Sequence, residues 1–255
     1  MTEYRGRMGR TFDVATSYAA STLFGGAGIF AKPCARQPAK PIELYEFEAC
    51  PFCRKVRVAL TYLDLDARIF PCPKNGPRFR RHVIERGGKA QFPFLVDPNG
   101  GFDGAPGRAS APSAPSAGRE MYESDDIVRY LASEYGGSVP LSLSLGPLSS
   151  IVSGFASAPR PGKGGFYRSA RAPEQPLELW SFEGSPYCRL VRETLSELEI
   201  PYLLHNVGKG SPKRAAFVER SGRMMVPYLV DPNSGRSMFE SADIVRYLNE
   251  TYALG

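Results

Sequence analysis

Two cysteines separated by two residues could carry out thiol–disulfide chemistry in this 255-residue chain. They belong to the motif Cys50-Pro51-Phe52-Cys53, which directly follows the strand-like run Ile42–Phe47. A thiol at a strand-to-helix junction lies near the free amides and the positive dipole end of the helix, and both favour the thiolate. We therefore expect Cys50 to be the attacking nucleophile. Cys53, one helical turn further on, is expected to resolve a mixed disulfide formed at Cys50.

A near copy of this motif lies 135 residues further along the chain, with serine in place of the first cysteine. It reads Ser185-Pro186-Tyr187-Cys188 and follows the run Leu177–Phe182. Other segments recur in the same order: Pro93–Asn99 as Pro227–Asn233, and Met121–Ser124 as Met238–Ser241. The pattern indicates a domain duplication rather than a short solenoid repeat. Because one copy lacks the first thiol, the two copies are predicted to have unequal roles.

The predicted helices and strands follow one order in both copies. An alternating strand is followed by a helix, a short strand, a basic helix, two more strands and a last helix, which gives an α/β fold of order βαβαββα. Pro51 and Pro186 suit the first turn of a helix, where no backbone donor is needed. Apolar residues on one face predict the last helices, over Ser124–Tyr135 and Ser241–Tyr252.

The repeats divide the chain into an N-terminal arm (1–40), a first domain (41–136), a linker (137–175) and a second domain (176–255). Acidic residues interrupt the basic start of the arm, which favours a flexible arm over a targeting segment. Phe102–Gly118 has the composition of a solvated loop. The apolar run 141–158 has about the length of a membrane span, but its serines, two glycines and Pro147 favour a segment that packs on the domains.

Charge and cysteine usage exclude several classes of function. The net charge of +6 comes from arginines interleaved with acidic residues, without the basic stripe that a nucleic-acid partner requires, although it suits a small anionic ligand. Five cysteines, two of them in one short motif, fit a reducing compartment. A structural zinc site needs two further ligands, and the chain offers no second cysteine pair. No metal is expected, although a cluster shared between two chains through Cys50 stays open.

Several other reactive side chains have more ordinary interpretations. Arg54 and Arg57 either add positive potential near Cys50 or are solvated helix charges. Cys72 ends the second strand, on the same edge of the sheet as Cys50 if the two strands are parallel. It is either a third redox thiol or, as we expect, a core residue, and Cys34 in the arm has no assigned role. His82 and His205 have no partner at motif spacing and are interpreted as structural.

The pattern from Cys50 through Phe92-Pro93 to Glu123-Ser124 resembles the glutaredoxin-like N-terminal domain of glutathione transferases, which has a thioredoxin fold. The resemblance implies that Pro93 and Pro227 are cis and that Phe92 and Val226 pair their backbones with the cysteinyl part of glutathione. It also implies that Glu123-Ser124 and Glu240-Ser241 hold the γ-glutamyl end at a helix start. Without a ligand, the prolines would be rigid turns and the Glu-Ser pairs helix caps.

More narrowly, the chain resembles tandem glutathione-transferase N-terminal-domain proteins of photosynthetic organisms and some bacteria. The likeness rests on long strings: Tyr45–Arg57, Phe70–Pro73, Glu183–Cys188 and Phe239–Ser241. It implies two tandem thioredoxin-like domains without the all-helical C-terminal domain of a transferase, so conjugation of bulky electrophiles is disfavoured. Ser185 would hydrogen-bond a glutathione thiolate, or the second copy is structural, with Cys188 as a small buried hydrophobe.

The leading hypothesis is a glutathione-linked thiol–disulfide oxidoreductase of glutaredoxin type, with glutathione as cosubstrate and a disulfide or glutathionylated thiol as substrate. The alternatives are a glutathione transferase or isomerase, and a non-enzymatic module that binds glutathione or a protein. We expect no nucleic-acid or membrane partner and leave the oligomeric state open. The expected compartment is the cytoplasm, or the plastid stroma in a photosynthetic eukaryote.

Overall fold

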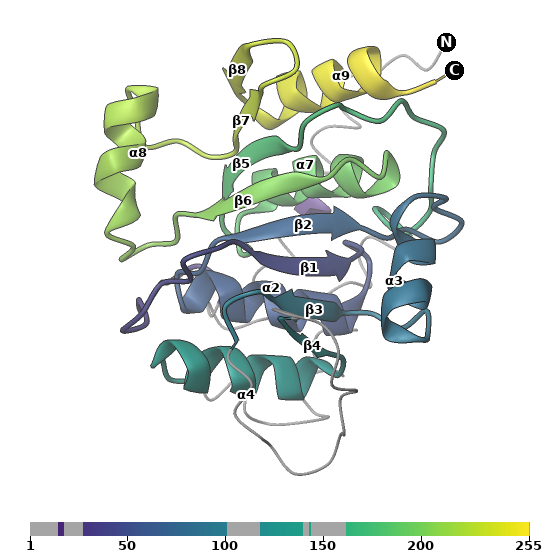
Figure 1. Ribbon diagram of the computed structural model, residues 1–255. Helices are drawn as coiled ribbons and strands as arrows, with labels where there is room; N and C mark the ends of the chain where they lie inside the picture. Colours follow the sequence, from purple (N-terminus) through teal and green to yellow (C-terminus); the bar gives the residue numbers. More distant parts are fainter. Residues whose placement is uncertain (1–14, 18–27, 101–117, 140–142, 144–161, 255) are drawn as a thin grey trace.

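The computed structural model describes residues 15–17, 28–100, 118–139, 143 and 162–254 (Figure 1). The first copy comprises β1 (Ile42–Glu46), α2 (Pro51–Tyr62), β2 (Ala67–Pro71), α3 (Phe79–Gly87), β3 (Phe94–Asp97), β4 (Arg119–Met121) and α4 (Ser124–Tyr135). The second comprises β5 (Leu177–Ser181), α7 (Pro186–Glu197), β6 (Tyr202–Asn206), α8 (Lys213–Ser221), β7 (Tyr228–Asp231), β8 (Arg236–Phe239) and α9 (Ser241–Tyr252). The predicted order βαβαββα and the bounds of both last helices are confirmed, and each copy has a thioredoxin-like fold.

The two copies share one continuous sheet. Its eight strands run in the order β4-β3-β1-β2-β6-β5-β7-β8. Within each copy the first two strands are parallel, and the remaining pairs are antiparallel. The copies meet where β2 and β6 pair antiparallel, with Ile69 opposite Tyr202. This pairing satisfies the edge of each half-sheet, and it makes the second copy a fixed neighbour of the first.

Helices cover the two faces of the sheet unequally. α2, α4, α7 and α9 pack on one face around a core shared by both copies, whereas α3 and α8 lie on the other face, at the right and left of Figure 1. Side chains alternate along β1, so Leu44 enters the shared core and Tyr45 faces α3. By the same alternation the Glu46 side chain lies on the face of the sheet that α2 covers, the helix that begins at the dithiol motif.

A buried aspartate fixes the last helix in each copy. Asp97 accepts hydrogen bonds from the hydroxyls of Tyr130 and Tyr135, at 2.8 and 2.6 Å. In the second copy Asp231 accepts from Tyr247 and Tyr252, at 2.6 and 2.5 Å. Because these carboxylates end β3 and β7, they tie the sheet to α4 and α9 in the same way in both copies.

Two backbone straps cross from one copy to the other. Residues 28–36 hydrogen-bond to the second copy at Gly184 and Lys209 and then to the first at Tyr62 and Tyr135. Residues 162–171 repeat this with the copies exchanged, bonding to Lys74 and then to Glu197 and Tyr252. The expectation of a flexible arm is therefore wrong for residues 28–36, because backbone hydrogen bonds along this segment fix it to the folded domains.

Two other expectations fall largely outside the described residues. Of the apolar run 141–158, Leu143 is described, and it is buried against Val58, Ala59 and Val128. Of the loop 102–118, the structure describes Gly118 alone. Among the helices that the structure describes, none is long and apolar enough to cross a membrane.

Candidate functional site

Cys50 occupies the N-cap of α2, with Pro51 in the first turn. Its Sγ accepts a hydrogen bond from the backbone amide of Cys53 at 3.3 Å. A further hydrogen bond from the Cys53 side chain lowers the pKa of the Cys50 thiol below its ordinary value, although burial acts in the opposite direction. The geometry therefore favours a thiolate at Cys50, as expected for a nucleophile at a helix N-terminus.

Cys53 is buried one turn further into α2 and is a free thiol, as is Cys50. Burial raises the pKa of the Cys53 thiol well above its ordinary value, and the hydrogen bond to Cys50 raises it further. The two thiols thus differ in acidity in the direction that an attacking and a resolving cysteine require.

The predicted glutathione-binding residues of the first copy lie on neighbouring loops. The Phe92–Pro93 peptide bond is cis, as the resemblance implies. The ring of Phe92 meets Phe47, which precedes the dithiol motif, at a centroid distance of 6.1 Å, and Arg80 lies 4.8 Å above the Phe92 ring. These contacts join the β1–α2 loop and the loop before β3 at one edge of the sheet.

The Glu-Ser pair at the start of α4 has an unusual backbone. Glu123 has a φ of +64°, a region that non-glycine residues rarely adopt, and its side chain does not cap the helix. Ser124 is buried at the first helical position. Asp125, which would oppose a carboxylate ligand, is paired with Lys55 of α2. Asp126, the other acidic residue of this turn, is paired with Arg129, so both first-turn carboxylates have a cationic partner.

The second copy reproduces this arrangement without the first thiol. Ser185 is the N-cap of α7 and accepts from the amide of Cys188 at 3.3 Å. The Val226–Pro227 bond is cis, and Glu240 before the buried Ser241 has a φ of +67°. Burial raises the pKa of Cys188. In addition, Ser17 donates a hydrogen bond to the Pro186 carbonyl at 2.8 Å, so part of the N-terminal arm lies against the first turn of α7.

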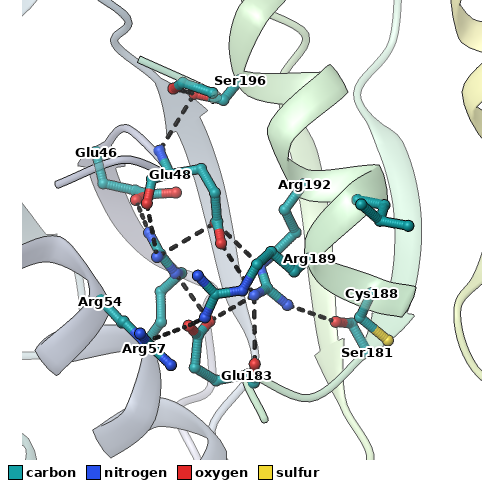
Figure 2. Close-up of polar contacts among 12 residues, drawn as sticks. Glu46, Glu48, Arg54, Arg57, Ser181, Glu183, Cys188, Arg189, Arg192 and Ser196 are labelled. Atoms are coloured by element: carbon teal, nitrogen blue, oxygen red, sulfur yellow. Dashed lines mark hydrogen bonds and ion pairs between the residues drawn. The ribbon is translucent and has the colours of Figure 1, made fainter. Parts of the chain in front are cut away.

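The interface between the copies contains a buried cluster of charges (Figure 2), which we call the interdomain charge cluster. Its members are Glu46, Glu48, Arg54 and Arg57 from the first copy and Glu183, Arg189 and Arg192 from the second. Glu183 accepts a hydrogen bond from Arg57 at 3.0 Å and forms ion pairs with Arg192 at 2.8 Å and with Arg54 at 3.3 Å. Glu48 pairs with Arg57 at 3.3 Å and with Arg192 at 3.1 Å. Arg54 and Arg57 are therefore not solvated helix charges, because both are buried, Arg57 against carboxylates of both copies and Arg54 against Glu183.

The cluster separates the pKa values of its carboxyl groups. Burial raises the pKa of Glu46 to about 7, although Arg57 contacts it. Burial also acts on Glu183, but Arg192, Arg57, Arg189 and Arg54 outweigh it and lower its pKa to about 2. Glu183 is thus ionised and Glu46 is poised near neutrality.

Comparison with known proteins shows which family this chain is similar to. The family model for the glutathione S-transferase N-terminal domain matches residues 44–139 and again residues 179–254. The chain belongs to this family. Its membership supports a glutathione-related function. No curated protein sequence matches the chain. A solved trimeric glutathione transferase of Leishmania, TDR1, aligns over 82% of this chain and 68% of its own, with 14% identity and a TM-score of 0.26.

In this member of the glutathione S-transferase N-terminal-domain family, the remaining thiols lie away from the motif chemistry. Cys72 is buried beside Tyr45 and Phe94, as expected for a core residue. Cys34 is buried, and its thiol donates to the carbonyl of Arg36 at 2.9 Å. In the described part of the chain no group of three or more His, Cys, Asp or Glu side chains could hold a metal ion.

The histidines differ from one another. His82 stacks on Tyr45, which fits a structural role. His205, however, has carboxylate neighbours that sequence spacing did not reveal: its Nδ1 lies 3.2 Å from Asp66 of the first copy, and its Nε2 lies 3.4 Å from Glu178.

Sequence reasoning missed the interdomain charge cluster, although a signal was present. Three of its charged positions recur at the spacing of the duplication, as Glu48 and Glu183, Arg54 and Arg189, and Arg57 and Arg192. A repeated pattern of opposite charges beside a buried strand end indicates paired rather than solvated side chains.

Proposed function

We propose that this protein is a glutathione-linked thiol–disulfide oxidoreductase that acts through Cys50 and Cys53. The observation that carries the proposal is the opposite shift of the two thiol pKa values, lowered at Cys50 and raised at Cys53, at the N-terminus of α2. Family membership supports glutathione as the cosubstrate.

The first step is attack of the Cys50 thiolate on the disulfide of a glutathionylated thiol. The S–S bond of the substrate breaks, a mixed disulfide forms between Cys50 and glutathione, and the substrate thiolate leaves and takes a proton from solvent. The mixed disulfide can then be resolved in two ways. A second glutathione thiolate can attack it and release oxidised glutathione, or Cys53 can attack Cys50 and release reduced glutathione. In the second case two further glutathione molecules reduce the Cys50–Cys53 disulfide.

Binding of glutathione is assigned to the residues around this thiol. We assign the cysteinyl part of glutathione to the backbone of Phe92, before cis Pro93, and its γ-glutamyl carboxylate to the first turn of α4 at Glu123-Ser124. The strained backbone of Glu123 supports this assignment, since such strain is concentrated at binding sites.

The proton of the buried Cys53 needs an acceptor, and we assign this role to Glu46. At the equivalent position of the second copy the Ser181 side chain hydrogen-bonds to Cys188, the counterpart of Cys53, and the two lie together in Figure 2. Glu46 should therefore lie beside Cys53, and the charge of Glu46 raises the pKa of that thiol. A carboxyl group with a pKa of about 7 can take a proton and return it near neutral pH.

The second copy is proposed to contribute binding and structure without redox turnover. Ser185 replaces the nucleophile, and Val226, Pro227, Glu240 and Ser241 retain the positions assigned to glutathione. Cys188 then has no mixed disulfide to resolve.

The test is turnover of a glutathionylated peptide by wild type and four variants. Cys50→Ser should lose measurable turnover. Cys53→Ser should keep part of its activity, because glutathione can still attack the mixed disulfide at Cys50. Ser185→Ala should leave turnover unchanged. Equal turnover in wild type and Cys50→Ser would exclude the proposal, and conjugation of an aromatic electrophile that survives in Cys50→Ser would indicate a transferase at Ser185. The fourth variant, Glu46→Gln, should slow turnover in wild type and have no effect in the Cys53→Ser background.

A further inference from the structure

The exposed phenylalanine and tyrosine rings gather at one edge of the sheet, the edge at which β1 and β5 end. Among the described residues four such rings are exposed, each by between 39% and 56%. Phe52 and Tyr187 belong to the two motifs, and Phe30 and Phe166 belong to the two backbone straps. The members of each pair occupy equivalent positions in the two copies. Aromatic rings are enriched at protein interfaces, so this edge has the composition of a binding surface.

The second of the two backbone straps lies directly beside the nucleophile. The Gly165 carbonyl accepts a hydrogen bond from the amide of Lys74 at 2.7 Å. Gly165 also lies so close to the dithiol loop that a Cβ atom on it would be 3.1 Å from the Cβ atom of Ala49. Ala49 immediately precedes Cys50, and Phe166 immediately follows Gly165. The Phe166 ring is therefore carried by a segment that contacts the residue next to the thiol.

The second copy holds this strap against the dithiol loop. The Ser196 hydroxyl donates to the Gly164 carbonyl at 2.6 Å and accepts from the amide of Glu48 at 3.3 Å. Glu197 accepts from the Gly164 amide at 3.0 Å and pairs with Arg168 at 2.9 Å. Because both backbone groups of Gly164 are bonded to α7, the strap is a fixed wall of the thiol site.

Cys50 lies between the loop assigned to glutathione and this strap. The strands run in the order β3-β1-β2, so the cis-proline loop before β3 flanks the dithiol loop on one side, and Lys74 after β2 flanks it on the other. Since β1 and β2 are parallel and β3 is antiparallel to β1, all three loops meet at one edge of the sheet. Glutathione is assigned to the β3 side, which leaves the strap side for the other half of a mixed disulfide.

The exposed charges on the strap side are positive. Lys163 and Lys74 are both exposed, and the Lys74 Nζ atom lies 5.7 Å from the centroid of the Phe166 ring. Neither lysine has an ion pair with another described residue. The carboxylates of this region are already engaged, Glu48 and Glu197 by arginines and Glu199 by two backbone amides at the start of α3. A partner with acidic groups would therefore complement this surface.

We propose that the Cys50 site acts on glutathionylated polypeptides, and that Phe52, Phe166, Lys74 and Lys163 bind the polypeptide half of the mixed disulfide. The inference rests on the proposed thiol–disulfide function of Cys50. The polypeptide that fits this docking surface carries a large apolar side chain beside the modified cysteine and acidic residues near it. Contact of the apolar side chain with the rings supplies most of the affinity, and the lysines select for acidic partners.

Three glutathionylated peptides of equal length separate these features. The first has Leu beside the modified cysteine and two Glu residues near it, the second has Ala in place of Leu, and the third has Lys in place of both Glu residues. The reference substrate is the mixed disulfide of glutathione with 2-mercaptoethanol, which has no polypeptide half. The kcat/KM of each peptide is divided by that of the reference substrate, so that effects on the thiol itself cancel.

The first peptide should give the highest ratio with the wild-type protein. We expect the Ala peptide to fall about tenfold below it, the size of one well-packed interface contact. The Lys peptide should fall below it by a similar factor at low salt, and this difference should shrink as salt is added, because exposed charges are screened.

Two pairs of variants locate the docking surface. Phe166→Ala should lower the ratio for the first peptide about tenfold, and Lys74→Gln should remove most of its advantage over the Lys peptide. Phe30→Ala and Lys209→Gln change the equivalent residues beside Ser185, where no thiol can react, and should leave both ratios unchanged. Urea denaturation checks that all four variants are folded.

The reference substrate separates the two levels of the proposal. If wild type did not turn it over, the thiol–disulfide function and the docking surface would both be wrong. If wild type turned it over but gave equal ratios for the three peptides, or if folded Phe166→Ala kept the wild-type ratio, the docking surface alone would be overturned.

Discussion

At equivalent positions the first copy carries Glu46, Cys50 and Cys53, and the second carries Ser181, Ser185 and Cys188. Around them the scaffold hardly differs: both have a cis proline, an N-cap side chain that accepts from the amide three residues on, and a strained glutamate before the last helix. The acid and the nucleophile differ together. This joint difference supports the role proposed for Glu46 beside the dithiol, in addition to its ion pair with Arg57 in the interdomain charge cluster.

The interdomain charge cluster connects the two copies energetically, and it is not symmetric. Glu183 of the second copy contacts arginines at four positions, whereas its counterpart Glu48 contacts those at two. The second copy thus supplies a carboxylate that Arg54 and Arg57, on the helix of the dithiol, require. The copy that lacks the first cysteine therefore stabilises the helix of the copy that has it.

The largest effect is expected from breaking this asymmetry. Glu183→Gln removes a buried charge from four guanidinium groups and should lower the free energy of unfolding by about 3–5 kcal/mol. Glu48→Gln, its matched control, should cost less, because fewer arginines lose a partner. Urea denaturation of both variants measures the difference, and an equal loss would show that the two positions are energetically equivalent.

Glu46 should make the free energy of unfolding depend on pH, whereas its counterpart Ser181 does not titrate. Its pKa is about 7 in the folded state against an ordinary 4.5, and it is surrounded by Arg57, Arg192, Glu48 and Glu183. Between these values the folded state holds a proton that the unfolded chain has released, so the free energy of unfolding falls as the pH rises through the window, by roughly 3 kcal/mol.

The measurement compares urea midpoints of wild type and Glu46→Gln between about pH 4.5 and pH 7. Since glutamine does not titrate, the variant should lack the decline that wild type shows. Glu183 titrates near pH 2 and does not contribute in this range. Parallel pH profiles of the two proteins would contradict the assignment.

The shared scaffold should respond alike in both copies. Asp97→Asn and Asp231→Asn each disturb a buried carboxylate that accepts from two tyrosine hydroxyls, and each should cost about 2 kcal/mol. Thermal or urea unfolding of the two single variants gives the comparison. A cost confined to one copy would mean that the duplication has diverged in its core as well as at its motif.

The smallest effect is expected from rebuilding the lost dithiol. In a Cys50→Ser background, Ser185→Cys should restore only the part of the turnover in which glutathione attacks the mixed disulfide directly, because Ser181 lies where the first copy has Glu46. Addition of Ser181→Glu should then raise turnover by about tenfold or more. If Ser185→Cys alone restored full activity, the acid would have no part in the chemistry.

Much of the fold could be predicted from the sequence, because its signals are local. The prolines after Cys50 and Ser185 fix where α2 and α7 begin, and periodic apolar residues fix α4 and α9. The continuous sheet could not be predicted, since the pairing of β2 with β6 depends on two edges that are distant in sequence. Burial of Arg54 and Arg57 was missed for the same reason: Glu183, which neutralises them, lies in the other copy.

The sequence predicts which motif residues belong to the candidate site, but it does not predict which side chains surround them. The roles of Phe92, Glu123 and Ser124 depend on a ligand and stay predictions, whereas the cis bond at Pro93 is confirmed. Nothing in the spacing of His205 pointed to Asp66, because these residues meet only across the β2–β6 seam.

The central claim, that Cys50 alone is the reactive thiol, is tested most directly by alkylation of the native protein with iodoacetamide across a pH series, with each cysteine quantified by peptide mass spectrometry. All five thiols are buried, but the pKa is lowered at Cys50 and raised by burial at Cys34, Cys53, Cys72 and Cys188. We therefore expect Cys50 to react first and at a pH below that of an ordinary thiol, while the other four react slowly. If Cys50 reacted no faster than Cys188, or only at alkaline pH, the account of the first copy as the redox copy would be wrong.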